Sequence, residues 1–361
     1  MSTAEHEVMP TGVDLTYCTD DVPGITRRRA GRSFAYYDCD RTKIDDPDTL
    51  ARIKRLAVPP AWTDVWIAPH PECHIQATGR DAKGRKQYRY HPDWTKWRDE
   101  VKYERLVEFG DALPRMRRRL AQDLALDDLP REKVLATVVH LLETTLVRVG
   151  NDEYAKANGS YGLTTLRSRH VTTDGDAVKL AFKAKSGKSQ SVKVRDRQLT
   201  RIMRRLHDLP GQRLFRYEAD GELRDVHSDD VNEYLREISN RDFTAKDFRT
   251  WMGTLLAAHA LGDLEPPRSD RAARQEATKA IEAVANQLNN TKAVCKRSYV
   301  HPDVVELYVE GELPELWADG PSRDGRWLLA EERKLLHVLR ETRARARRAR
   351  RGRTSERRAA A

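Results

Sequence analysis

The chain has 361 residues, of which 39% are hydrophobic and 34% charged, a composition typical of a soluble protein with a very polar surface. Its formal net charge of +10 and isoelectric point of about 9.4 indicate a polyanionic partner. The most apolar run, residues 134–147, contains a histidine and a glutamate and is too short to span a bilayer. It predicts a buried helix and gives no sign of membrane insertion.

The excess of positive charge is concentrated at the C-terminus. Residues 341–361 contain nine arginines and two glutamates, a net charge of +7, whereas the preceding 340 residues carry only about +3. A polyanion-binding site in the body of the protein must therefore be a local patch. The tail itself is of low complexity and is predicted to be disordered until it meets a polyanion.

The four cysteines are scattered without CxxC spacing, which indicates neither a disulfide framework nor a zinc ribbon. They are Cys18, Cys39, Cys73 and Cys295. This usage predicts a reducing compartment, and the first twelve residues lack the features of a signal peptide, so a cytoplasmic location is expected. His70, Cys73 and His74 form a short cluster without a distant partner pair, and ordinary loop residues are favoured there over a metal site.

The pattern of apolar residues divides the chain into three regions. Residues 1–92 are predicted to form a small β-rich domain, because short alternating runs are separated by turn-forming Pro, Gly and Asp. The runs are SFAYYD (33–38), DVWIAP (64–69), HIQATG (74–79) and KQYRYH (86–91). Residues 93–340 are predicted to be a mainly helical domain, followed by the basic tail at 341–361.

Helical periodicity, with apolar residues three and four apart, recurs in the second region. The segments are 93–107, 131–148, 195–206, 228–239, 244–261, 270–289 and 328–340. One interlude at 169–194 shows strand alternation on either side of Asp174-Gly175 and Ser186-Gly187, and predicts three strands with two tight turns. The expected fold class is α+β.

The functional interpretation depends on Tyr299, which follows Lys296, Arg297 and Ser298 in the run TKAVCKRSYVHP. A tyrosine assisted by two arginines and a lysine can attack a phosphodiester. The arginine forks bind the non-bridging oxygens, a cation helps the leaving oxygen to depart, and the phenolate forms a covalent phosphotyrosine. Neither a metal nor another cofactor is then required.

Each candidate cation also has a purely structural interpretation. Arg148 ends an apolar helical pattern and could stabilise the helix C-terminus, while Arg249 in AKDFRTWMGT could form an internal salt bridge. Lys185 lies in AKSGKS, for which a solvated hairpin tip is the ordinary interpretation. The same run is not an ATP-binding P-loop, because Phe182 stands where that motif requires glycine.

The order of five sequence blocks resembles the catalytic domain of the type IB DNA topoisomerases, most closely the short poxvirus-like and bacterial members. The blocks are LVRVGNDEY (146–154), GLTTLRSRHV (162–171), FKAKSGKS (182–189), KDFRTW (246–251) and NNTKAVCKRSYVHP (289–302). Two further segments, VPPAWTDVWI (58–67) and GRDAKGRKQYRYHPDW (79–94), resemble the N-terminal domain of the same enzymes. The likeness extends from about residue 25 to residue 310.

The resemblance implies a role for each residue of a candidate active site. Tyr299 would be the nucleophile, with Arg148 and Arg249 as clamps on the phosphate oxygens. Lys185 would be the general acid towards the departing 5′-oxygen. Asn290 stands where poxvirus enzymes have histidine and several bacterial members have asparagine, and its amide can donate a hydrogen bond but cannot titrate near neutrality. The implied reaction relaxes supercoiled DNA through a 3′-phosphotyrosyl intermediate and religation, without ATP or metal.

The resemblance also implies contacts with double-stranded DNA. The expected DNA-binding residues are Arg80, Lys83, Arg85, Gln87, Tyr88, Tyr90 and Tyr154. Alternation places Tyr88 and Tyr90 on one strand face. The alternative is a half-buried aromatic strand with a solvated basic face. A monomeric clamp that closes around the duplex would need a hinge, which is expected near residues 91–96.

Two other functions are compatible with parts of this pattern. A tyrosine recombinase shares the chemistry but usually has histidine three residues before its second arginine, and Lys246 occupies that position here. A DNA-binding protein that has lost catalysis is disfavoured because every catalytic position carries a competent residue. The type IB topoisomerase interpretation accounts for the hairpin and for the N-terminal region as well.

Overall fold

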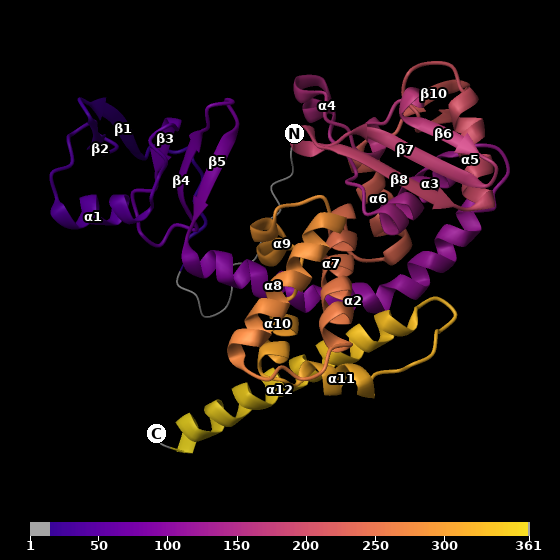
Figure 1. The fold of residues 1–361 in the computed structure, drawn as a ribbon. Coiled ribbons are helices and arrows are strands. Elements are labelled where there is room, and N and C mark those ends of the chain that lie inside the picture. Colours follow the sequence, from indigo (N-terminus) through magenta and orange to yellow (C-terminus); the bar gives the residue numbers. More distant parts are fainter. Residues whose placement is uncertain (1–14, 360–361) are drawn as a thin grey trace. The chain divides into compact units, whose positions relative to one another are not determined.

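The computed structural model describes residues 15–359, and the chain divides into two compact units, Met1–Tyr103 and Glu104–Ala361 (Figure 1). The division falls within the long helix α2 (Pro92–Leu124). The N-terminal residues for which the sequence predicts no signal peptide lie outside the described residues. A β-rich first part followed by a mainly helical second part confirms the expected α+β class.

The first unit is built on an antiparallel sheet of five strands in the order β2-β1-β3-β4-β5. The strands are β1 (Ile25–Ala30), β2 (Ser33–Tyr37), β3 (Thr63–Ile67), β4 (Ile75–Arg80) and β5 (Lys86–Tyr90). Helix α1 (Pro47–Arg55) begins at an Asp46 side chain that caps it, and Ile53 of this helix joins Val65 and Ile67 in a small core. Strands β2 to β5 coincide with the four predicted β runs.

Strand β1 is not predicted, because consecutive arginines interrupt its alternation. In the structure these side chains pack on aromatic rings of β2. The Cζ of Arg27 lies 4.1 Å from the ring centroid of Phe34, and that of Arg28 lies 4.9 Å from the ring centroid of Tyr37. Arg27 also donates a hydrogen bond of 2.7 Å to the carbonyl of Trp62. Cation–π contacts and backbone hydrogen bonds here replace the apolar pattern of an ordinary strand.

Cys18 and Cys73 form a disulfide, so the prediction of a chain without disulfides is wrong. The two cysteines are 55 residues apart, and they meet because Thr16 pairs with Cys73 in an isolated β-bridge that spacing in the sequence does not reveal. Cys39 and Cys295 are free. The inference of a reducing compartment from cysteine usage therefore loses its basis.

The second unit is mainly helical and has one large apolar core. Its helices after α2 are α3 (Arg131–Thr145), α4 (Asp152–Asn158), α5 (Arg197–Asp208), α6 (Ser228–Ser239), α7 (Ala245–Gly262), α8 (Asp270–Gln287), α9 (Lys292–Ser298), α10 (Pro302–Val309), α11 (Leu313–Asp319) and α12 (Ala330–Ala359). All the predicted helical segments lie on these helices or on α2. The short helices α4, α9, α10 and α11 are not predicted, because so few turns leave no clear periodicity. Within the described chain, no helix is both long and apolar enough to cross a bilayer.

The predicted β interlude is confirmed as an antiparallel sheet of three strands in sequence order. The strands are β6 (Val171–Asp174), β7 (Ala177–Lys183) and β8 (Ser189–Arg195). Gly175 and Gly187 have φ angles of +55° and +74° at the two turns, a region that glycine adopts readily. A second hairpin, β9 (Arg216–Ala219) with β10 (Glu222–Asp225), is not predicted, because its strands are short and charged.

A buried ion cluster connects the start of α12 to α2 and α3. Arg117 donates to both carboxylate oxygens of Glu332 at 2.7 Å and to Glu143 at 2.7 Å. Burial alone would lower the pKa of Arg117, but the two carboxylates outweigh burial and raise it. The sequence predicts disorder for 341–361, whereas the structure continues α12 as far as Ala359, consistent with the high helix propensity of Ala and Arg.

Loss of the Cys18–Cys73 bond is expected to destabilise the first unit by about 4 kcal/mol, because a loop of this length gains much conformational freedom in the unfolded chain. Urea unfolding of wild type, Cys18→Ser and the free-cysteine control Cys39→Ser checks this. Reductant should shift the wild type and the control to the midpoint of Cys18→Ser and leave that variant unchanged. Equal midpoints for wild type and Cys18→Ser without reductant would contradict the prediction.

Candidate active site

Helix α7 places a buried arginine at the centre of the candidate active site. Arg249 is 4% exposed and donates hydrogen bonds to the carbonyl of Leu146 and, at 2.7 Å, to that of Leu288. Its Cζ lies 5.1 Å from the ring centroid of Tyr299. Leu146 caps α3 and Leu288 caps α8. One guanidinium therefore connects the ends of two helices with the candidate nucleophile.

The charge of Arg249 is poorly compensated. Burial lowers the pKa of Arg249 and the nearby charge of Arg148 lowers it further, while Tyr299 and Cys295 oppose these effects. No carboxylate of a described residue forms an ion pair with it, so the interpretation as an internal salt bridge is not supported. A buried cation held only by neutral groups is costly, and an incoming anion would offset that cost.

Arg148 lies beyond the end of α3, after Leu146 has turned the chain with a φ of 57°. Its guanidinium donates to Oδ1 of Asn290, which follows α8. Nδ2 of Asn290 and Nε of Arg249 are both buried and have no protein partner. Buried donors are nearly always paired, and the acceptor oxygens of a bound anion would satisfy these two. Arg148 thus contacts the cluster rather than the carbonyls at the helix end.

The backbone of Tyr299 rests directly on α7. A Cβ added to Gly253 would lie 2.5 Å from the carbonyl oxygen of Tyr299 and 3.0 Å from its Cβ. Thr254 donates through Oγ1 to the same carbonyl at 3.2 Å. Arg249 and Gly253 are four residues apart and share a helix face. One face of α7 therefore supplies a charge beside the phenol ring and leaves room for the tyrosine backbone.

Cys295 is the thiol next to this cluster, one helical turn before Tyr299. It is fully buried, and burial raises its pKa to about 11 against the opposing effect of Arg249. The thiol is therefore protonated at neutral pH and is a poor nucleophile. Burial therefore argues against Cys295 as a nucleophile in this cluster.

The hairpin between β7 and β8 carries Lys185 and Lys188, both exposed. Nζ of Lys185 lies 5.8 Å from the ring centroid of Tyr154 in α4. Tyr154 is itself 39% exposed, and its backbone N–H donates to the side chain of Asn151 at 3.0 Å. Among the described contacts, Lys185 meets α4 and not the cluster around Arg249.

In the first unit, Tyr88 and Tyr90 project from one face of β5, as alternation predicts. Their side chains are 42% and 41% exposed, and their rings stack with centroids 5.8 Å apart and planes 11° apart. Gln87 donates to Asp81 at 3.1 Å. Both rings are thus partly open to solvent and partly covered, and they are available to a ligand on this face of β5.

The turn between β4 and β5 is organised by Asp81. Its carboxylate accepts from Nε of Arg85 at 2.8 Å and from the backbone N–H of Lys83 at 2.9 Å. The hydrogen bond from Arg85 holds the pKa of Asp81 below its usual range. Arg80 donates to the carbonyl of Gly84 at 2.9 Å. The turn is thus compact, and of its basic side chains Arg85 is paired with Asp81, while Arg80 lies 3.7 Å from Asp64.

Comparison with known proteins identifies the family. A family model described as "Eukaryotic DNA topoisomerase I, catalytic core" matches residues 91–311, and one described as "Bacterial DNA topoisomerase IB, N-terminal domain" matches residues 33–81. The chain is 33% identical over 309 residues to the DNA topoisomerase 1B of Acanthamoeba polyphaga mimivirus, which covers 83% of this chain and 91% of that protein. The chain belongs to the type IB DNA topoisomerases.

As a type IB topoisomerase, the protein is an isomerase that acts on DNA and relaxes its supercoils. The matched catalytic core begins at the start of α2 and contains the whole cluster around Arg249. The matched N-terminal model ends at Asp81, the first residue of the turn between β4 and β5. The resemblance first recognised in the sequence blocks is thereby confirmed.

The sequence analysis did not identify the residues that position Tyr299 without taking part in the chemistry. Gly253 and Thr254 could have been found from helical spacing, since they follow Arg249 by about one turn.

Two of the candidate metal ligands considered in the sequence have other roles. Nδ1 of His74 accepts a hydrogen bond from the backbone N–H of Cys18, and Cys73 is part of the disulfide. Among described residues, no group of His, Cys, Asp and Glu is suited to hold a metal.

Gly253→Ala is expected to slow single-turnover cleavage by about 100-fold, because the added Cβ displaces the backbone of Tyr299 and misalignment by about 1 Å has an effect of that size. DNA affinity should change little. The matched control is Gly325→Ala, whose added Cβ comes no closer than 3.5 Å to another atom. Full activity in Gly253→Ala would show that the packing of Tyr299 on α7 does not position the phenol.

Proposed function

We propose that Tyr299 is the nucleophile and that the cluster around it holds the scissile phosphate. Arg148 and Arg249 bind the two non-bridging oxygens, and Asn290 donates a further hydrogen bond. The observation that supports this most directly is the pair of buried, unpartnered donors, Nε of Arg249 and Nδ2 of Asn290, beside the ring that Arg249 contacts. Phosphate oxygens would satisfy both donors.

The proposed reaction exchanges one phosphodiester for another. The phenolic oxygen attacks phosphorus, the bond to the 5′-oxygen breaks, and a 3′-phosphotyrosine and a free 5′-hydroxyl result. Lys185 gives a proton to the leaving oxygen, and the phenol loses its own proton to water or to the phosphate. Religation reverses these steps, and because the bond energy is conserved, neither ATP nor a metal is needed. Charge stabilisation and positioning supply most of the rate enhancement.

Binding of duplex DNA is proposed for the exposed face of β5 and for α4. The stacked rings of Tyr88 and Tyr90 offer flat apolar surface beside the basic turn, and Tyr154 offers a third exposed ring near Lys185. The N-terminal domain (1–92) and the catalytic domain (93–340) would close on DNA as a monomeric clamp, with a hinge near residues 91–96. Inside a cell the enzyme would act on chromosomal DNA in the cytoplasm.

The purified protein is expected to relax both negative and positive supercoils in EDTA without nucleotide, whereas Tyr299→Phe binds duplex DNA but neither relaxes it nor forms an adduct. Denaturant trapping of the wild type should leave protein on the 3′-phosphate and a free 5′-hydroxyl. An absolute need for magnesium or ATP, a 5′-linked adduct, or an active Tyr299→Phe would each overturn the mechanism.

Lys185→Ala is expected to slow cleavage by about 100- to 10,000-fold, the usual contribution of a general acid. A 5′-bridging phosphorothiolate should restore much of the rate, because a sulfur leaving group barely needs a proton. Arg148→Ala and Arg249→Ala should not be rescued. Lys188→Ala on the same hairpin is the matched control, and rescue of that variant in place of Lys185→Ala would identify it as the acid.

Deletion of residues 341–361 is expected to weaken DNA binding and to make it less dependent on salt. The segment carries a net charge of +7. Each phosphate that it neutralises adds about 0.9 to the magnitude of the logarithmic salt slope. Affinity is measured over a salt series, beside single-turnover cleavage at saturating enzyme, which should be little changed. An unchanged slope would mean that the tail does not contact DNA.

A further inference from the structure

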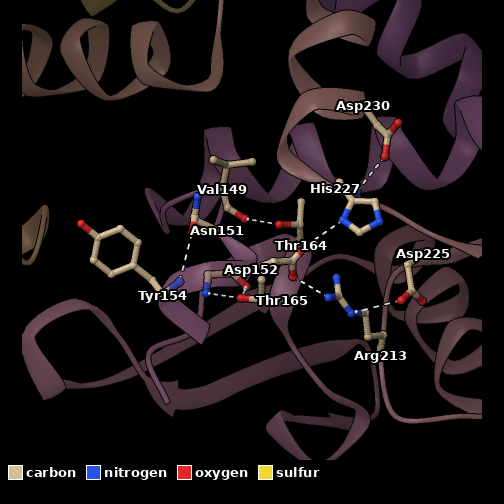
Figure 2. A network of polar contacts seen from close by, with 11 residues as sticks. Val149, Asn151, Asp152, Tyr154, Thr164, Thr165, Arg213, Asp225, His227 and Asp230 are labelled. Atoms are coloured by element: carbon tan, nitrogen blue, oxygen red, sulfur yellow. Dashed lines mark hydrogen bonds and ion pairs between the residues drawn. The ribbon is translucent and has the colours of Figure 1, made fainter. Parts of the chain in front are cut away.

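Asp152 lies between Arg148 and Tyr154 in the chain and is hydrogen-bonded to distant parts of the second unit. As the first residue of α4, it accepts hydrogen bonds from Arg213 at Oδ1 and from Nδ1 of His227 at Oδ2, the latter at 2.7 Å (Figure 2). Arg213 also pairs through Nε with Asp225 of β10 at 3.2 Å. The carboxylate thus joins the short helix α4 to the β9–β10 hairpin and to the start of α6.

Both partners of Asp152 are themselves held in place. The backbone N–H of His227 donates to Asp230 in the first turn of α6 at 2.7 Å, which fixes the histidine at the helix N-terminus. Arg213 forms an isolated β-bridge with Arg167. Burial alone would raise the pKa of Asp152, but His227 and Arg213 outweigh burial and lower it. The group that accepts these hydrogen bonds is therefore a carboxylate at neutral pH.

The beginning of the same segment, at Arg148 and Val149, is hydrogen-bonded to the turn at Leu163–Thr165. The carbonyl of Arg148 accepts from Leu163 N–H at 2.9 Å, and that of Val149 accepts from Thr164 N–H at 2.7 Å. Gly150, at a φ of +110°, lies so close to Gly162 that a Cβ on Gly162 would be 2.5 Å from its Cα. Backbone contacts hold the beginning of the segment, and side chains hold its continuation at Asp152.

We propose that Asp152, through its hydrogen bonds with Arg213 and His227, is a positioning residue that holds the Arg148–Tyr154 segment in the geometry needed for cleavage. The inference rests on the proposed roles of Arg148 at the phosphate and of Tyr154 at the DNA. Asn151 caps α4 and accepts a hydrogen bond from the backbone of Tyr154. The hydrogen bonds to Asp152 prevent this short helix from turning away from Arg148. A helix of two turns has little stability of its own and depends on such contacts.

The test measures single-turnover cleavage at saturating enzyme, DNA affinity and melting temperature for Asp152→Ala, Arg213→Ala and His227→Ala. Each is expected to cleave about 10- to 100-fold more slowly, with affinity and melting temperature close to wild type, because positioning affects the reacting geometry. The double variant of Asp152 and Arg213 should be no slower than the slower single variant, since both remove the same contact. Asp220→Asn, which removes the exposed pair with Arg224 from the neighbouring turn, is the control and should be unchanged.

His227→Asn decides the outcome if an alanine variant unfolds. An asparagine amide nitrogen is as many bonds from the backbone as Nδ1 and can donate to Asp152, so His227→Asn should cleave at close to the wild-type rate while His227→Ala is slow. Wild-type cleavage by both Asp152→Ala and His227→Ala, or equal defects in His227→Ala and His227→Asn, overturns the inference. Undiminished cleavage by Arg148→Ala would instead overturn the proposed function on which it rests.

Discussion

A buried guanidinium without a carboxylate partner is the constraint around which the catalytic core is arranged. Arg249 is almost fully buried, and the carbonyls that it binds end α3 and α8. Those two helix ends lead to Arg148 and Asn290, and the ring of Tyr299 lies against the same guanidinium. If Arg249 were moved or neutralised, the three segments would lose their common partner.

The same constraint explains how the site can be selective for an anion. The dipoles of two carbonyl groups and the face of an aromatic ring compensate the charge of Arg249 only in part. Arg148 adds a second positive charge nearby. The folded protein therefore maintains an electrostatically unfavourable cluster that a phosphate would relieve. Under the proposed mechanism the donors are already oriented, so little reorganisation would be needed when charge develops on the phosphate oxygens. Burial of the large apolar core of the second unit offsets the unfavourable free energy of this cluster.

The first unit uses its charges differently. Asp81 binds Arg85, and Asp20 binds Lys86 at 2.8 Å, so basic groups next to the exposed tyrosines already have acidic partners. Burial opposes the lowering of the Asp20 pKa, yet Lys86 and Thr78 keep that pKa below its usual range. A DNA phosphate would have to compete with these carboxylates. If this face binds DNA as proposed, such competition would weaken binding and favour release of the DNA after each cycle.

Several features could be read from the sequence because they depend on local chemistry. Glycines at the turns of 169–194, the alternation in β5 and the apolar spacing of α7 each reflect a preference of a few neighbouring residues, and the structure bears them out. The identity and order of the blocks around Arg148, Lys185, Arg249 and Tyr299 were also sufficient to indicate the family. Cation–π pairing made β1 unpredictable, since its partners are contributed by another strand.

Other features exist only because distant segments meet. The sequence by itself determined the residue types of the proposed site: a phenol, two guanidiniums, an ammonium and an amide, with the secondary structures that carry most of them. Only the tertiary structure decided that Gly253 leaves room for Tyr299, that Cys18 reaches Cys73, and that Asp152 is held from two sides. Spacing along a chain records the preferences of neighbours, whereas these contacts arise from packing between segments separated by tens of residues.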